Sequence, residues 1–341
     1  MTNVSEYDRI EVLAQFLPRS PDQLNGLQES DAEIVRLSGT RTLLAVTTDS
    51  IVEEIEMGLY SDPYLIGWMT VTVSASDLAA VGAAPLGILI SETLPRDATQ
   101  GFLKRLQSGI RDASLRSGLP VLGGDTNTSD RLLVASTAIG LIEDGVPLMR
   151  TGARAGDVLM STGSLGMGAC YAWWRLFSPA GRDGGHYRPA ARLREGSLLR
   201  GRASACIDTS DGAFAALDLL VRLNGVGFVV EPHCDQFVHP AAARLAATIG
   251  LPAWAMMAGL HGEFELLFTI DESDASRVKH SMGFTRVGRV VDTPGVWIDT
   301  GSDLLEIDTG RVRNCFEGID GEVESCITEL RNALGVPVGD S

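Results

Sequence analysis

Strand-like and helix-like segments alternate along this chain, and the alternation restarts once near the middle. Apolar, β-branched runs typical of buried strands are followed by segments whose apolar residues have helical spacing. We expect strands at 42–47, 86–93, 121–122, 132–142, within 156–166, and at 205–208, 266–270 and 287–291, with helices at 5–17, 64–81, 98–117, 213–223 and 323–334. A break at 143–147 separates two series, and 341 residues is about the length of two ordinary domains. The pattern predicts an α/β (α+β) protein with one domain at 1–147 and another at 148–341.

The charge of the chain excludes several classes of partner. Against 28 Lys and Arg residues there are 44 Asp and Glu residues, a formal net charge of −16. Such a surface repels phosphate backbones and anionic lipids, so we expect no binding to nucleic acid or to a membrane. The first residues lack a signal-peptide pattern, and no apolar run reaches the roughly 18 residues that span a bilayer. Five cysteines without a CxxC pair favour neither a disulfide framework nor a zinc site, so we expect a cytoplasmic protein.

Six aspartates share one kind of setting: each lies at or near the end of a strand or helix, among glycines, hydroxyl residues or other small residues. They are Asp31, Asp49, Asp77, Asp125, Asp208 and Asp211. Small neighbours allow a ligand to approach the backbone, and hydroxyl groups add neutral oxygen donors. Mg²⁺ is commonly held by a few carboxylates together with substrate phosphates. One such aspartate by itself is more often a turn or cap residue, so the hypothesis of a metal site rests on the set.

Two of these settings are the hardest to explain as ordinary turns. Residues 123–126 read GGDT at the end of an expected strand, and residues 208–212 read DTSDG before an expected helix. Neither is a Walker A loop or a GxGxxG motif. If the carboxylates meet in the fold, their mutual repulsion has to be offset by bound cations, and a site for Mg²⁺ and phosphate is then expected.

Short motifs of this chain occur in the order seen in thiamine-monophosphate kinases, which the sequence resembles over roughly residues 25–300. They are TTDS (47–50), SDLAAVGAAP (76–85), LGGDT (122–126), RTGARAGD (150–157), STGSLG (161–166), IDTSDG (207–212) and FELLF (264–268). That family belongs to the superfamily of aminoimidazole ribonucleotide synthetase, selenophosphate synthetase and the hydrogenase-maturation carbamoyl dehydratase. The resemblance implies two α/β domains, with the N-terminal half pairing with a second subunit into a β-barrel. It also implies a homodimer that binds ATP and several Mg²⁺ ions between the domains.

Site residues follow from the same resemblance, position by position. The implied metal ligands are Asp31, Thr47, Thr48, Asp49, Asp77, Asp125, Asp208 and Asp211. The implied nucleotide contacts are Gly124, Asp125, Arg150 and Ser210. We expect Asp211 and Arg150 to be catalytic, because phosphoryl transfer depends mainly on positioning and charge neutralisation and a guanidinium offers a planar, permanently charged donor.

The chain departs from the family pattern mainly where the acceptor substrate is expected. A segment that reads Val-Glu-Gly-Val-His-Phe in the kinases, with a substrate-binding His, is VEEIEM here and places Glu56 at the His position. Gly-Gly-Glu-Asp-Tyr-Glu becomes LHGEFE (260–265), which makes His261 and Glu263 further acceptor candidates. A carboxylate in place of an imidazole reverses the available charge. We therefore expect an acceptor other than thiamine monophosphate, with a cationic or hydrogen-bond-donating group near Glu56.

Two further departures affect the metal site and the C-terminal region. The N-terminal Gly-Asp-Asp motif reads Glu29-Ser30-Asp31, so one acidic ligand is lost or displaced. The aromatic signature of the family near the C-terminus has its nearest counterpart in CFEGIDG (315–321). Three hypotheses stay open: a kinase-like phosphotransferase, an ATP-dependent synthetase or dehydratase that acts through a phosphorylated intermediate, and a nucleotide-binding regulatory protein with weakened turnover. The final VGDS lacks the carrier cysteine of the dehydratases, which weighs against that branch.

Overall fold

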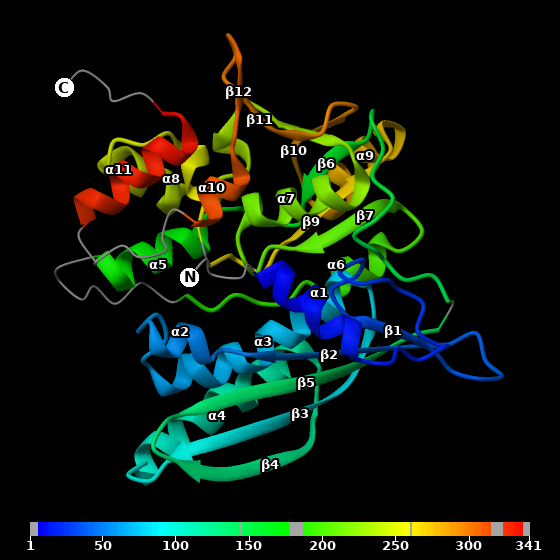
Figure 1. Cartoon of the computed structure of the whole chain (residues 1–341), viewed down its shortest axis with the longest axis vertical. Coiled ribbons are helices and arrows are strands. Elements are labelled where there is room, and N and C mark those ends of the chain that lie inside the picture. Colours follow the sequence, from blue (N-terminus) through cyan, green and yellow to red (C-terminus); the bar gives the residue numbers. More distant parts are fainter. Residues whose placement is uncertain (1–5, 144, 178–186, 260, 315–322, 337–341) are drawn as a thin grey trace.

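The structure, a computed structural model, describes residues 6–143, 145–177, 187–259, 261–314 and 323–336, and contains two β-sheets (Figure 1). The first half of the chain forms α1 (Glu6–Phe16), β1 (Glu33–Arg36), β2 (Leu43–Ser50), α2 (Val52–Glu56), α3 (Pro63–Ala80), β3 (Ala84–Pro95), α4 (Gln100–Ser117), β4 (Val121–Ser129) and β5 (Leu133–Ile142). The second half forms β6 (Val158–Ser161), α5 (Met167–Phe177), α6 (Leu193–Leu199), β7 (Ala203–Asp208), α7 (Ala213–Asn224), β8 (Gly227–Val230), α8 (Pro240–Thr248), β9 (Leu266–Ile270), α9 (Glu272–Met282), β10 (Thr285–Val291), β11 (Gly295–Asp299), β12 (Leu304–Glu306), α10 (Thr309–Asn314) and α11 (Val323–Leu334), with short 3₁₀ turns at Cys234–Gln236 and Ala253–Met257.

Each sheet is mixed and draws its strands from one half of the chain. The first has the order β1-β2-β5-β3-β4, antiparallel except for the β3–β4 pair. The second has the order β12-β11-β8-β10-β6-β9-β7, in which only β8 and β11 run parallel. The expected mixed α/β architecture is therefore confirmed. Among the described residues the first sheet does not close into a barrel: β1 and β4 are its two edges.

Helix α3 joins the two halves. It contacts β2 and β5 of the first sheet as well as β7 and α6 of the second half, which explains why thirteen of its eighteen residues are buried. Asp62 caps its first turn by accepting a hydrogen bond from the Tyr64 amide at 3.1 Å, and Pro63 occupies the first helical position. Helices α3 and α4 approach closely at Gly67 and Gly109, where a Cβ on either residue would overlap the backbone of the other helix. The helix that carries Asp77 is thus fixed on several sides.

The largest departure from expectation in the first sheet concerns β4. The sequence predicts a two-residue strand that enters a GGDT turn, whereas β4 continues through this motif to Ser129 and pairs with β3. Gly124 allows this pairing because a Cβ there would overlap the Ile90 carbonyl. Residues 123–126 therefore extend along the edge of the sheet instead of forming a phosphate-binding turn after it. No helix in the described part of the chain is both long and apolar enough to cross a bilayer.

Candidate metal and nucleotide site

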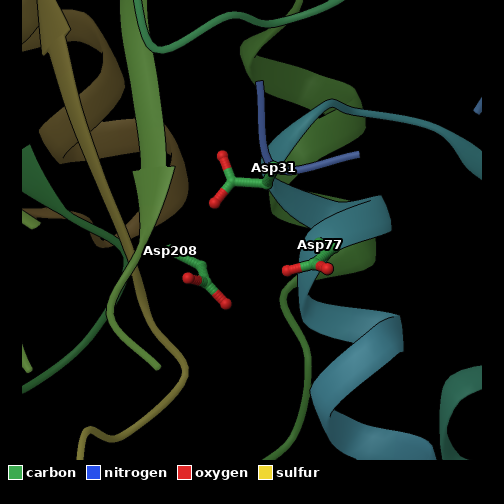
Figure 2. Close-up of side chains that lie close together, drawn as sticks. All are labelled: Asp31, Asp77 and Asp208. Carbon is green, nitrogen blue, oxygen red and sulfur yellow. The ribbon is translucent and has the colours of Figure 1, made fainter. Parts of the chain in front are cut away.

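Three aspartates from distant parts of the chain converge between the two halves (Figure 2). Asp31 precedes β1, Asp77 lies in the last turn of α3, and Asp208 is the last residue of β7. One carboxylate oxygen from each lies within 4.8 Å of the others. The Asp208 residue is 4% exposed and the Asp31 side chain 1%. The first half therefore supplies two members of this cluster, here called the aspartate triad, and the second half supplies one.

Hydroxyl side chains hold two members of the triad, Asp77 and Asp208, in place. Alternation along β2 directs Thr47 towards α3, and its hydroxyl donates to Asp77 at 2.5 Å. On α3, the hydroxyl of Ser76 donates to Asp208 at 2.5 Å. The hydroxyl of Ser210 donates to the other oxygen of Asp208 at 2.8 Å. Every one of these donors leaves further lone pairs on the carboxylates available.

The electrostatics of the triad disfavour three negative charges without a cation. Burial raises the pKa of Asp77 well above its ordinary value, and the carboxylates of Asp49, Asp208 and Asp31 raise it further. Burial likewise raises the pKa of Asp208, with a second contribution from Asp31. One oxygen of Asp31, Oδ2, is buried and accepts no hydrogen bond from any described residue. Three converging carboxylates with an unused buried oxygen fit a hard divalent cation such as Mg²⁺.

Arg150 lies at the edge of the triad. Its Nη2 donates to Asp31 Oδ1 at 2.8 Å, and its Nη1 donates to the Gln28 carbonyl at 3.3 Å. Burial alone would lower the pKa of this guanidinium, but Asp31 and the other nearby carboxylates keep it above its ordinary value, so the group stays charged. The guanidinium therefore lies beside the candidate cation ligands, where the predicted contact with a nucleotide phosphate would form.

Other predicted ligands lie around the triad. Asp49 is close enough to Asp77 for a hydrogen bond to act on its pKa, which burial raises overall. Thr48 points to the opposite face of the sheet, and its hydroxyl donates to the Ser136 carbonyl at 3.0 Å. Asp211 is exposed, and its charge raises the pKa of Asp208. Asp49 and Asp211 thus flank the triad, whereas the Thr48 hydroxyl does not face it.

The structure separates Gly124 and Asp125 from the triad. Along the sheet, Asp49 pairs with Ser136, Ser136 with Ile90, and Ile90 with Gly124. Three strand spacings correspond to about 14 Å. Gly124 and the exposed Asp125 instead line a cavity of about 750 Å³ between β4 and α4, so their predicted contacts with nucleotide and metal stay predictions.

The three predicted acceptor residues have partners of their own. Glu56 is exposed and accepts from Arg131 Nη1 at 2.7 Å. His261 is 4% exposed and lies 3.1 Å from the Tyr60 hydroxyl, and burial lowers its pKa to about 3. Glu263 is 7% exposed and accepts from the Gly166 amide at 2.9 Å, and burial raises its pKa to about 8. In this arrangement His261 and Glu263 offer an acceptor almost no surface; the segment 315–321 lies outside the described residues.

Sequence reasoning did not identify Ser76 as a site residue, and it did not single out Glu54. Ser76 precedes Asp77 on α3, yet its hydroxyl contacts Asp208, which lies 132 residues away. Glu54 lies on α2, and one of its oxygens, Oε2, is buried without a hydrogen-bond partner among the described residues. The signals in the sequence are weak: Ser76 is a serine beside an aspartate, and Glu54 is one of the three glutamates among residues 53–56.

Comparison with known proteins places these features in a family context. The family model described as AIR synthase related protein, N-terminal domain, matches residues 29–142. A thiamine-monophosphate kinase from Methanospirillum hungatei is 31% identical over 265 residues, which cover 75% of this chain and 84% of that protein. The Pyrococcus abyssi protein of the same name is 28% identical over 296 residues, with coverage of 86% and 92%. A solved complex described as AaThiL with AMPPCP and TMP has a TM-score of 0.74 at 24% identity, covering 88% of this chain and 95% of that one, which establishes a shared fold.

Proposed function

The chain belongs to the thiamine-monophosphate kinase family, and from this premise we propose that it transfers a phosphoryl group from ATP to a small-molecule acceptor with the help of Mg²⁺. The observation that carries the proposal is the aspartate triad with its unused Asp31 oxygen and the adjoining Arg150. The sequence relatives named above are described as kinases, and the solved neighbour is described as a complex with AMPPCP, so the coarse activity agrees with the chemistry of the site.

Each part of the site has a role in this proposal. Asp31, Asp77 and Asp208 would hold Mg²⁺, which supplies neutralisation of the phosphate charge when bound. Arg150 stays charged and binds phosphate oxygens through its planar donor face. Ser210 orients Asp208 through its hydroxyl and its amide, which donate at 2.8 and 3.3 Å. Together these residues position and neutralise a transferring phosphoryl group, which is most of what this chemistry requires.

The acceptor is expected to differ from thiamine monophosphate. The family's histidine position is Glu56, a carboxylate already paired with Arg131. His261 and Glu263 are buried in contacts within the protein. We therefore infer that the acceptor pocket of this chain differs in charge from the pockets of the named relatives, and that this difference determines which acceptor it takes.

A turnover assay tests the proposed function. The purified protein is incubated with ATP, with and without Mg²⁺, and with a panel of phosphate monoesters and alcohols that includes thiamine monophosphate. We expect ADP release that requires Mg²⁺ and a phosphorylated acceptor detectable by mass spectrometry, with thiamine monophosphate a poor acceptor. Failure of AMPPCP to bind in the presence of Mg²⁺ would refute the proposal, and ADP with free phosphate but no phosphorylated acceptor would show a different reaction class.

The exposed edge of the first sheet supports a second proposal, that two copies pair through β4. Residues 121–128 of this strand are exposed on both faces, and Leu122 is 55% exposed. Leu89 and Leu133 are exposed on the sheet face away from α3 and α4. A long, uncovered edge strand beside exposed leucines tends to associate with other chains, and pairing with a second copy would cover both the edge and the leucines.

Light scattering after size exclusion tests the pairing. We expect a dimer for the wild type and a shift of at least tenfold in the dissociation constant for Leu122→Glu, because the charge would be buried at the new interface. Leu304→Glu on β12, where the leucine is 54% exposed, is the matched control and should remain dimeric. A monomeric wild type at micromolar concentration would contradict the proposal.

A further inference from the structure

The side chain of Asn224, at the end of α7, binds the backbone of the segment that carries Arg150. Its Nδ2 donates to the Arg150 carbonyl at 2.9 Å. Its Oδ1 accepts from the amides of Gly152 and Ala153 at 2.7 and 3.0 Å. Nδ2 also donates to the Leu220 carbonyl within α7, at 2.8 Å. Both donors and the acceptor of this amide group are therefore used, and three of the four hydrogen bonds go to the segment of Arg150.

The segment that Asn224 holds has no secondary structure to fix it. Residues 146–154 contain neither helix nor strand, so individual hydrogen bonds determine the course of the backbone. The Arg150 amide donates to the Glu29 carbonyl at 2.8 Å, and the Arg150 carbonyl accepts from Asn224. The peptide groups on the two sides of the Arg150 Cα are thus anchored to different halves of the chain, one to Glu29 and the other to Asn224.

Helix α7 links Arg150 to the loop that follows Asp208. The helix begins directly after Gly212, at the end of that loop, and its last residue is Asn224. The guanidinium of Arg150 donates to Asp31, a second member of the aspartate triad. One helix therefore contacts both the loop of the triad and the backbone of the arginine beside it. A displacement of about 1 Å in such a group can remove a large part of the rate of a reaction that depends on positioning.

We propose that Asn224 is a positioning residue, which fixes the backbone of Arg150 so that the guanidinium meets the phosphates of a nucleotide beside the aspartate triad. This inference rests on the proposed function, because Arg150 contacts a phosphate only if a nucleotide binds there. Asn224 touches neither the nucleotide nor the acceptor and acts through Arg150 alone. A merely structural role would instead be to stabilise the end of α7 through the bond to Leu220, and the experiments below separate the two roles.

Asn224→Asp isolates the contact with the Arg150 carbonyl. Aspartate keeps an oxygen for the amides of Gly152 and Ala153 but places a second oxygen, in place of a donor, against that carbonyl. We expect the affinity for AMPPCP with Mg²⁺, measured by calorimetry, to fall about tenfold, and to fall at least as far in the uncharged variant Asn224→Ala. The matched control is Asn332→Asp, which adds the same charge at an exposed position near the end of α11 and should bind AMPPCP like the wild type.

A double-mutant cycle shows whether Asn224 acts through the guanidinium. In an Arg150→Ala protein, the further change Asn224→Ala should alter the affinity for AMPPCP by less than about twofold, because the group that Asn224 positions is gone. The same loss in the presence and absence of the Arg150 side chain would overturn the proposal, since a general disturbance of α7 needs no guanidinium to weaken binding.

An NMR signal of Arg150 gives a readout that needs no nucleotide. Its Nε is buried without a hydrogen-bond partner among the described residues, so we expect a slowly exchanging side-chain N–H signal, assigned by its loss in Arg150→Lys. In both Asn224 variants this signal should shift and its exchange with water should become about tenfold faster, with no change in Asn332→Asp. An unchanged signal in both variants would overturn the proposal. If the signal responds but AMPPCP does not bind the wild type, the positioning of Arg150 stands and the proposed function fails.

Discussion

Replacing Asp208 with asparagine is expected to reduce Mg²⁺-dependent turnover by about 10³-fold or more while making the metal-free protein more stable. The two effects have one cause. Asp208 is buried beside Asp31 and Asp77, and its ionised form is opposed by burial and by the charge of Asp31. Asparagine removes that charge and keeps the shape of the side chain. It therefore removes a cation ligand and an unfavourable repulsion together.

The hydrogen bonds of Asp208 can survive the substitution. The amide oxygen of asparagine can accept from Ser210, as Oδ1 of the aspartate does now. The amide nitrogen can donate to the hydroxyl of Ser76, which donates in the wild type and would accept in the variant. We expect the free energy of unfolding in EDTA at pH 8 to rise by about 1–3 kcal/mol.

Measurement requires turnover, Mg²⁺ titration and chemical unfolding of the same preparation. Asp130→Asn is the control, because the Asp130 side chain is 89% exposed and pairs only with Arg96 among the described residues. It should leave turnover and unfolding close to those of the wild type. An Asp208→Asn protein that is less stable in EDTA than the wild type would show that the triad is not under repulsion, and retained turnover would show that it is not the cation site.

The sequence predicts the backbone of this site better than its side-chain partners. Strand β2 is predictable because a β-branched, apolar run ends in hydroxyl residues and Asp49. The long helix α3 with Asp77 near its end is predictable from an apolar, small-residue segment that begins behind Asp62-Pro63. Local sequence therefore indicates that Asp49 and Asp77 lie near the ends of their elements, whereas the packing of β2 against α3 that brings them together is a property of the fold.

The contacts that decide function depend on residues far away in the chain. Glu54 and Glu56 have the same chemistry, yet Glu56 is exposed and pairs with Arg131, 75 residues further on, whereas Oε2 of Glu54 is buried without a hydrogen-bond partner among the described residues. Similarly, GGDT resembles a turn after a strand, since glycines usually end strands. It becomes part of β4 because the Ile90 backbone approaches Gly124 too closely for any side chain. The secondary-structure propensities of neighbouring residues predict neither the pairing of Arg131 with Glu56 nor the approach of the Ile90 backbone to Gly124.

Gly262→Ala is expected to produce the second large loss, through the loop that holds Asp208 and Ser210. A Cβ at Gly262 would overlap the Thr209 carbonyl and would lie 2.8 Å from the Gly212 amide nitrogen, so it meets backbone on both sides. The Gly262 amide also donates to the Ser210 carbonyl at 2.7 Å. The loop has to move away from residue 262, and it takes the triad member Asp208 with it.

We expect Gly262→Ala to lower the free energy of unfolding by about 1–3 kcal/mol and turnover by about 10²-fold or more, measured well below its melting temperature. Gly101→Ala on α4 is the control, because the nearest atom to its Cβ would be the Thr99 hydroxyl at 3.8 Å; this change should leave activity intact and stabilise the helix slightly. Mg²⁺ titration distinguishes the cause of the loss in Gly262→Ala. A shifted loop weakens Mg²⁺ binding because Asp208 leaves the triad, whereas a folded variant with unchanged Mg²⁺ affinity and unchanged turnover would show that the loop does not set the geometry of the site.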